Sequence, residues 1–150
     1  MEKIQSSIFI NAPKEKVWNT MLQDETYRIW TAAFHAGSYY IGNWEEGSDI
    51  RFLGPSEDGT EGGMIGFIKE NRPYEFISIE YRGMIMNDVE DFDSEAVKGF
   101  VGAHENYTFI EKDGGTEVLV EIDAIDEYKA MFEDTWPKAL QALKELVERD

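Results

Sequence analysis

The sequence contains no cysteine, which excludes disulfide bonds, thiol catalysis and thiolate metal sites. It also lacks any run of about 18 apolar residues, the length at which a segment is read as a membrane-spanning helix. The first residues lead directly into an alternating pattern, without the apolar stretch that a signal peptide carries. We therefore expect a cytoplasmic protein that is neither secreted nor membrane-spanning.

Positive charge is scarce: 14 Lys and Arg residues stand against 31 Asp and Glu residues, so the net charge is −17. This excess of negative charge repels phosphate backbones and anionic lipid surfaces. Nucleic acid is thus not an expected partner, and the acidity is typical of a soluble surface. The 150 residues, of which 42% are hydrophobic and 13% aromatic, predict one folded domain over residues 1–150.

The N-terminal part alternates between apolar and polar residues and then changes to helical spacing. Ile4, Ile8 and Ile10 share one face of residues 3–10, which predicts a half-buried strand. Asn11-Ala12-Pro13 supplies a capping residue and a proline suited to a first helical turn. We expect a short helix from there to about Leu22 and a second one over residues 25–33.

Turn residues divide the middle of the chain into short β-rich runs. The predicted strands cover residues 38–41, 49–53, 63–70, 75–83, 104–111 and 116–125. Turns this short favour antiparallel pairing. Residues 84–103 hold a block of acidic residues between two apolar patches, and we interpret this segment as a long loop or lid.

The C-terminal part predicts a long amphipathic helix that ends near Glu148. Its apolar residues recur every three or four positions and are Phe132, Trp136, Ala139, Leu140, Leu143, Leu146 and Val147. Pro137 lacks an amide proton and clashes with the preceding turn, so we expect a kink or a new helix start after Thr135. One strand, two short helices, six strands and a long helix form a single domain of the α+β class.

Three segments in this order resemble a known superfamily. Residues 10–18 (INAPKEKVW) are similar to the opening strand-to-helix motif of the START-like, or SRPBCC, superfamily, and residues 66–73 (GFIKENRP) to its central hairpin. Residues 136–146 (WPKALQALKEL) resemble the closing helix of the branch named after homologs of the activator of heat-shock protein 90 ATPase. The resemblance implies the helix-grip fold, in which a curved antiparallel sheet of about seven strands wraps around a long C-terminal helix.

Superfamily members commonly hold lipids, hormones, polyketides or other hydrophobic molecules between sheet and helix, so the resemblance implies a ligand cavity there. The residues expected to line it are Trp30, Phe34, Tyr40, Trp44, Phe52, Ile68, Ile79, Tyr81, Glu105, Tyr107, Phe109, Val120, Phe132, Trp136 and Leu140. The alternative is that these side chains only fill a core, which aromatic residues commonly do.

Glu105 is the polar residue that strand alternation places on an apolar face, together with Tyr107 and Phe109. A buried carboxylate must be paired, hydrogen-bonded or neutral, and such groups often mark functional sites. In the competing interpretation Glu105 lies at the beginning of its strand, exposed to solvent and beside Arg82.

No motif in the sequence predicts a metal, a cofactor or a catalytic residue. The acidic residues 88–95 lack the glycine and the final glutamate of an EF-hand loop. His35 and His104 have no further ligands at metal spacing. The glycines form neither a P-loop nor a dinucleotide fingerprint, and no serine lies in a nucleophile elbow.

Three functions remain open at this point. We favour a binding domain without catalytic activity that takes a small hydrophobic, lipid-like or aromatic molecule. The second candidate is a co-chaperone whose partner is a chaperone with ATPase activity, as the branch name implies. The third is an enzyme of the cyclase or aromatase kind that other START-like branches contain, with Glu105 and Tyr107 as acid and base.

Overall fold

The computed structural model describes residues 1–149, and its elements follow the predicted order. The strands are β1 (Glu2–Ile10), β2 (Tyr39–Gly42), β3 (Asp49–Pro55), β4 (Glu61–Arg72), β5 (Phe76–Met86), β6 (Val89–Asp91), β7 (His104–Lys112) and β8 (Gly115–Ala124). The helices are α1 (Lys14–Leu22), α2 (Asp24–Trp30), α3 (Glu95–Lys98) and α4 (Asp126–Glu148), with a 3-10 turn at Thr31–Ala33.

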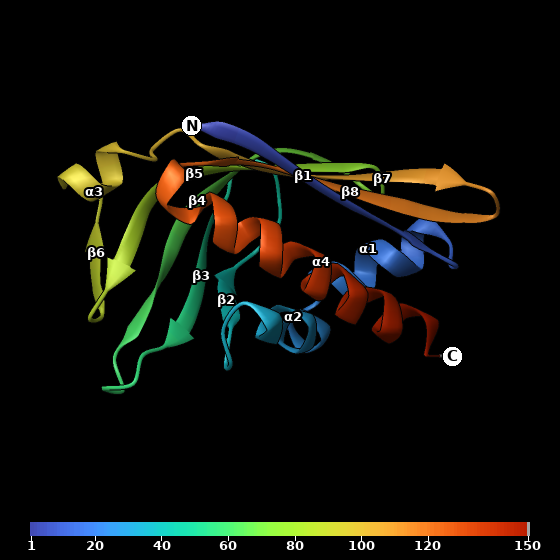
Figure 1. The fold of residues 1–150 in the computed structure, drawn as a ribbon, viewed down its shortest axis with the longest axis horizontal. Coiled ribbons are helices and arrows are strands. Elements are labelled where there is room, and N and C mark those ends of the chain that lie inside the picture. The colour runs from blue at the N-terminus through green and yellow to red at the C-terminus, as the bar shows by residue number, and fades with distance from the viewer. Residues whose placement is uncertain (150) are drawn as a thin grey trace.

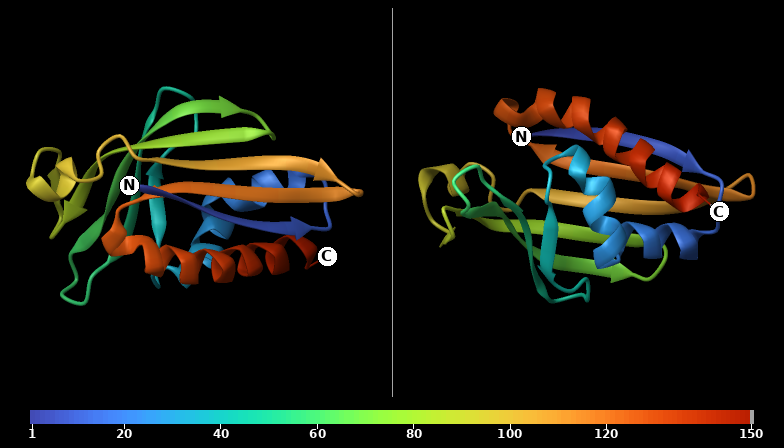
Figure 2. Two further views of the ribbon diagram at one scale, coloured as in Figure 1. Left: turned by 45° about the horizontal axis from the view of Figure 1, so that its top comes forward. Right: turned by 90° about the horizontal axis from the view of Figure 1, so that it is seen from below.

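One antiparallel sheet contains all of these strands, in the order β1-β8-β7-β5-β4-β3-β2, with β6 added beside β5. The sheet is curved, and α4 crosses its concave side (Figure 1). In the view from below, α1 and α2 lie on the same side of the sheet as α4 (Figure 2, right). The α+β class and the helix-grip architecture predicted from the sequence are therefore confirmed.

The alternation of the strands determines which side chains reach the helices. In β8, Val118, Val120 and Ile122 are buried, whereas Leu119 and Glu121 between them are partly exposed. The same alternation holds in β1, where Ile4 pairs with Ile122 of β8 and both are buried. Because successive side chains of a strand point to opposite faces, the sequence pattern predicts the core side of the sheet correctly.

The bend of the sheet is concentrated between β4 and β5. The pairing of these strands shifts register between Ile65 and Gly66 and again between Ile68 and Glu70. Such bulges bend a strand and increase its twist. A Cβ atom on Gly66 would lie 2.9 Å from Cγ2 of Ile79, so a larger residue at this bend would force the Ile79 side chain to shift.

Helix α4 is continuous from Asp126 to Glu148, and Pro137 lies inside it. The predicted end of the helix is confirmed. Of the two alternatives predicted at Pro137, a new start after Thr135 is wrong, and a kink stays a prediction. The buried stripe contains Trp136, Ala139, Leu140, Leu143 and Val147. We attribute the continuity to this stripe, because burial of these side chains against the sheet offsets the one backbone hydrogen bond that a proline removes.

The segment predicted as a long loop or lid, residues 84–103, is more ordered than expected. Strand β5 continues to Met86, a turn at Asn87 and Asp88 with positive φ reverses the chain, and β6 pairs back onto β5. The Ser94 side chain accepts a hydrogen bond from the amide of Val97 and caps α3. Residues 99–103 then connect α3 to β7 without regular structure.

Candidate functional site

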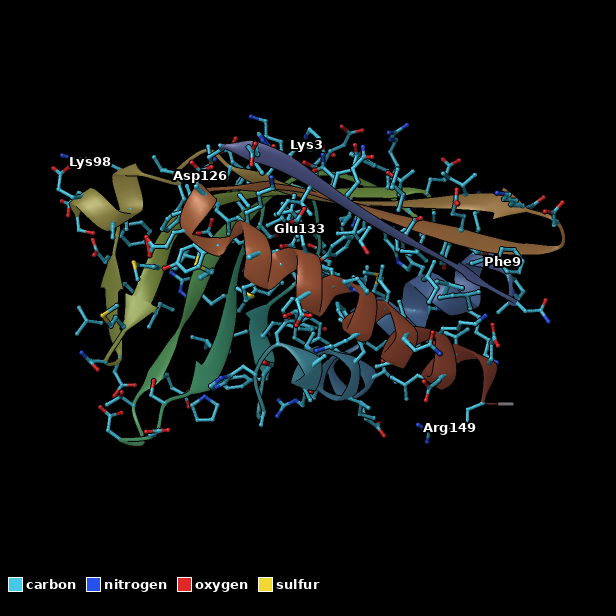
Figure 3. All side chains as sticks on the ribbon, viewed as in Figure 1. Lys3, Phe9, Lys98, Asp126, Glu133 and Arg149 are labelled. Atoms are coloured by element: carbon cyan, nitrogen blue, oxygen red, sulfur yellow. The ribbon has the colours of Figure 1, made fainter. Side chains whose placement is uncertain are left out.

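A cavity of about 580 Å³ lies between the curved sheet and the helices. Its walls come from α2 and the 3-10 turn, from β3, β4, β5, β7 and β8, and from the first half of α4. Ala96 of α3 and Tyr128 of α4 also line it, so the cavity extends to the end of the molecule where α4 begins. Figure 3 marks this end by Lys98 on α3 and Asp126 at the start of α4.

Trp136 of α4 lies at the centre of the aromatic wall and is only 3% exposed. Its ring centroid lies 4.9 Å from that of Phe34 and 6.0 Å from those of Trp30 and Tyr107. The predicted burial of Trp136 is thus confirmed. Its indole Nε1, however, has no hydrogen-bond partner among the described residues. A buried N–H without a partner is unusual, since most buried polar groups are paired.

Glu105 is the buried acid of the cavity, with 8% of its surface exposed. Tyr81 donates a hydrogen bond from its hydroxyl to Oε1 of Glu105 over 2.7 Å, and Tyr107 donates one to Oε2. Arg82 is bonded instead to Glu80, with 3.0 Å between Nε and Oε1. The competing interpretation, a solvated Glu105 beside Arg82, is therefore wrong.

Burial dominates the electrostatics of this cluster. It raises the pKa of the Glu105 carboxyl, and the hydrogen bonds from Tyr107 and Tyr81 lower it only in part. Burial, followed by the negative charge of Glu105, raises the pKa of Tyr81 and of Tyr107 well above the ordinary value. The same two causes raise the pKa of Tyr27. No Lys, Arg or His within residues 1–149 forms an ion pair with Glu105.

The structure brings part of the predicted lining set together on the cavity wall. The residues of that set that line the cavity are Trp30, Phe34, Phe52, Tyr81, Glu105, Tyr107, Phe132 and Trp136. They come from α2 and the residues just after it, from strands β3, β5 and β7, and from α4. Whether they contact a ligand stays a prediction.

The other members of the predicted set do not line this cavity. Ile68, Ile79, Val120 and Leu140 are almost fully buried in the main core. Phe109 packs on Trp18, with ring centroids 5.2 Å apart, towards the other end of the sheet. Tyr40 and Trp44 both donate hydrogen bonds to the carbonyl of Leu22. These bonds connect β2 and the residues just after it to the end of α1.

Sequence reasoning missed several lining residues, among them Tyr27, Thr31, Met64, Met84, Phe100 and Met131. Tyr27 and Thr31 had a usable signal, because with Trp30 and Phe34 they recur at three- and four-residue spacing on one helical face. Met64, Met84 and Phe100 had none, since their positions depend on the bend of the sheet and on the 99–103 connection.

Neither histidine takes part in a metal site. His35 Nε2 lies 2.5 Å from the carbonyl oxygen of Pro55, and His104 lies between the carboxylates of Glu80 and Asp123. Within residues 1–149, no group of three or more acidic or histidine side chains is arranged to hold a metal ion. None of the helices in this range combines the length and the apolar character that crossing a membrane requires.

A curved sheet that grips a long helix over an aromatic cavity defines a helix-grip protein of the START-like class. Residues 11–148 match the family model described as "Activator of Hsp90 ATPase homolog 1-like protein". The chain belongs to this family. A comparison with curated proteins found no match.

Solved structures from several bacteria share the fold at low sequence identity. The Aha1 dimer from Colwellia psychrerythraea is 17% identical, with a TM-score of 0.73 over 99% of this chain and 97% of that one. A protein from Cytophaga hutchinsonii is 21% identical, with a TM-score of 0.73 over 99% and 95% of the two chains. CalU16 from Micromonospora echinospora is 16% identical, with a TM-score of 0.65 over 97% and 76%.

Proposed function

We propose that this chain binds a small, largely apolar molecule in the cavity between sheet and helix. The observation that carries the proposal is the cavity itself, whose volume of about 580 Å³ falls within the range of small-molecule sites, roughly 300–1,000 Å³. Aromatic rings form much of its wall, and Glu105 supplies a polar group. Apolar walls with a few polar anchors are the usual design of such sites.

The test is a titration with an apolar fluorophore, followed both by its own emission and by quenching of tryptophan fluorescence. Trp30 and Trp136 line the cavity, so a bound fluorophore lies close to two indoles. We expect a dissociation constant in the micromolar range or below, which corresponds to a binding free energy on the order of −8 kcal/mol.

A filling substitution shows where the fluorophore binds. Ala103 lines the cavity and is buried, so Ala103→Phe places a ring inside it. Ala130→Phe adds the same ring on the exposed side of α4 and serves as the matched control. We expect Ala103→Phe to weaken binding at least about tenfold and Ala130→Phe to leave it unchanged. Absence of binding to the unsubstituted protein would remove the ligand-binding proposal.

The second candidate function is stimulation of a chaperone ATPase, and the family description is the observation that favours it. Its test is the ATPase rate of heat-shock protein 90 with and without an equimolar amount of this chain. A stimulated rate that Ala103→Phe does not alter supports a co-chaperone that acts independently of its cavity. An unchanged rate together with no detectable binding to the chaperone removes this candidate.

A further inference from the structure

The charged side chains on the cavity wall have one sign. They are Glu105 and Glu127, and the lining residues within 1–149 include neither Lys nor Arg. Asp123 also borders the cavity, but its carboxylate lies on the opposite face of β8 from Ile122 and pairs there with Lys3. His35 is the one basic group there, and its Nε2 is already within hydrogen-bonding distance of the Pro55 carbonyl. A carboxylate or phosphate ligand would therefore meet negative charge without a cation to pair with.

Glu105 is hydrogen-bonded but has no counter-charge. Tyr81 and Tyr107 each donate one hydrogen bond to it, whereas an ionised carboxylate offers about four acceptor positions. A buried carboxylate without a cationic partner is costly, and ion pairing or neutralisation is the usual remedy. The cluster thus has free acceptor capacity and lacks positive charge on the side that faces the cavity.

Aromatic rings surround this acid. The ring centroid of Tyr107 lies 6.0 Å from that of Trp136. The ring centroid of Phe52 lies 6.3 Å from that of Tyr81 and 6.4 Å from that of Tyr27. Rings of Trp, Tyr and Phe attract cations to their faces within about 6 Å. An ammonium group that enters the cavity would find both a carboxylate and ring faces. A neutral hydroxyl group would use only the hydrogen-bonding part of that environment.

The approach to the cavity has the same sign. Glu127 lines the cavity and is exposed at the start of α4. The net charge of −17 adds a long-range attraction for cations. We propose that the cavity is selective for organic cations, and that its ligand is an amine with an apolar, aromatic-sized body whose ammonium group pairs with Glu105. This inference rests on the proposed ligand-binding function and specifies its ligand class.

The experiment compares three probes of one shape at pH 7: 2-(1-naphthyl)ethylamine, 2-(1-naphthyl)ethanol and 1-naphthylacetate. Their affinities are measured by calorimetry or by displacement of the apolar fluorophore. We expect the amine to bind at least about tenfold more tightly than the alcohol, and the carboxylate to bind most weakly. An alcohol that binds as tightly as the amine, or a carboxylate that binds more tightly, overturns the charge selectivity and leaves the proposed function standing.

Glu105→Gln tests the residue itself, because it removes the charge and keeps the shape. In this variant we expect the preference for the amine over the alcohol to fall below about threefold. Glu133→Gln, on the exposed face of α4 (Figure 3), changes the net charge by the same amount and should keep the full preference.

A Glu105→Gln variant that keeps the amine preference overturns the assignment to Glu105. If that variant does not fold, the ranking of the three probes on the unsubstituted protein still decides the selectivity. Binding of the fluorophore with none of the three probes bound also overturns the inference. Failure of the fluorophore and all three probes to bind contradicts the proposed function itself.

Discussion

The hydroxyl of Tyr107 donates a hydrogen bond to the carboxylate of Glu105, two residues earlier on the same strand. Both side chains point to the helix side of β7, because residues two apart in a strand share a face. The second donor, Tyr81, comes from β5, which pairs with β7 through Ile79 and Glu105. Two neighbouring strands thus enclose one acid between two phenols.

Tyr107→Phe should destabilise the protein, because it leaves one oxygen of a buried carboxylate without a partner. We expect the free energy of unfolding at pH 7 to fall by about 1–3 kcal/mol, measured by urea denaturation. Tyr128→Phe removes a hydroxyl from a side chain that is 46% exposed on α4 and should change stability by less than about 0.5 kcal/mol. Equal losses in the two variants would contradict a structural role for the Tyr107–Glu105 bond.

The raised pKa of Glu105 makes stability depend on pH in a defined direction. The folded state holds the Glu105 proton more tightly than the unfolded chain, whose carboxyl has the ordinary pKa of 4.5. Relative to Glu105→Gln, the unsubstituted protein should therefore lose stability as pH rises from 4.5 to the folded-state pKa and change no further above it.

Urea denaturation of both proteins across pH 4–8 measures this difference in unfolding free energy. The other acids are the same in the two proteins, so their contribution cancels when one is subtracted from the other. A difference that grows in favour of the unsubstituted protein with rising pH would mean that the pKa of Glu105 is lowered by folding.

Truncation of Trp136 should cost about 3–5 kcal/mol of unfolding free energy, as for large aromatic residues in cores. The physical reason is the loss of its contacts with Phe34, Trp30 and Tyr107 across the sheet–helix interface. Tyr128→Ala, at a side chain of the same helix that is 46% exposed, is the control. A loss below about 1 kcal/mol for Trp136→Ala would show that the cavity end of α4 contributes little to stability.

Gly63→Ala should be far more harmful than Gly62→Ala, although the two glycines are adjacent in β4 and both line the cavity. A Cβ atom on Gly63 would lie 1.8 Å from the carbonyl oxygen of Phe52, which would force β3 and β4 apart. A Cβ atom on Gly62 would meet Ile85 O at an acceptable 3.4 Å. We expect a loss of at least about 2 kcal/mol for Gly63→Ala and under about 1 kcal/mol for Gly62→Ala, measured by thermal or urea denaturation.

Alternation and helical spacing were sufficient to predict the main elements. They place the isoleucines of β1 and the apolar residues of β8 on the core side, and they correctly predict the side on which Glu105 lies. These signals are local, since each depends only on the period of one element. Strand β6 and helix α3 were missed because their few residues are too short to establish a period.

The membership of the cavity wall was harder to predict than the fold. Tyr107 and Phe109 share a face of β7, but one contacts Trp136 at the cavity and the other packs on Trp18. The difference arises from where α4 and α1 cross the sheet, and no period within β7 carries that information. The continuity of α4 through Pro137 was unpredictable for a similar reason, because tertiary packing decides it.

The position of β1 has a consequence for the order of folding. Strand β1 lies at an edge of the sheet, and its one neighbour within residues 1–149 is β8, with Glu2 opposite Ala124. During synthesis, Ile4, Ile8 and Ile10 therefore have no strand to pair with until more than a hundred later residues, including β8, have left the ribosome. Contacts this distant in sequence close slowly, because the chain must lose the entropy of a long loop first. Of the strands in this sheet, β1 is thus made before the others and is among the last to pair.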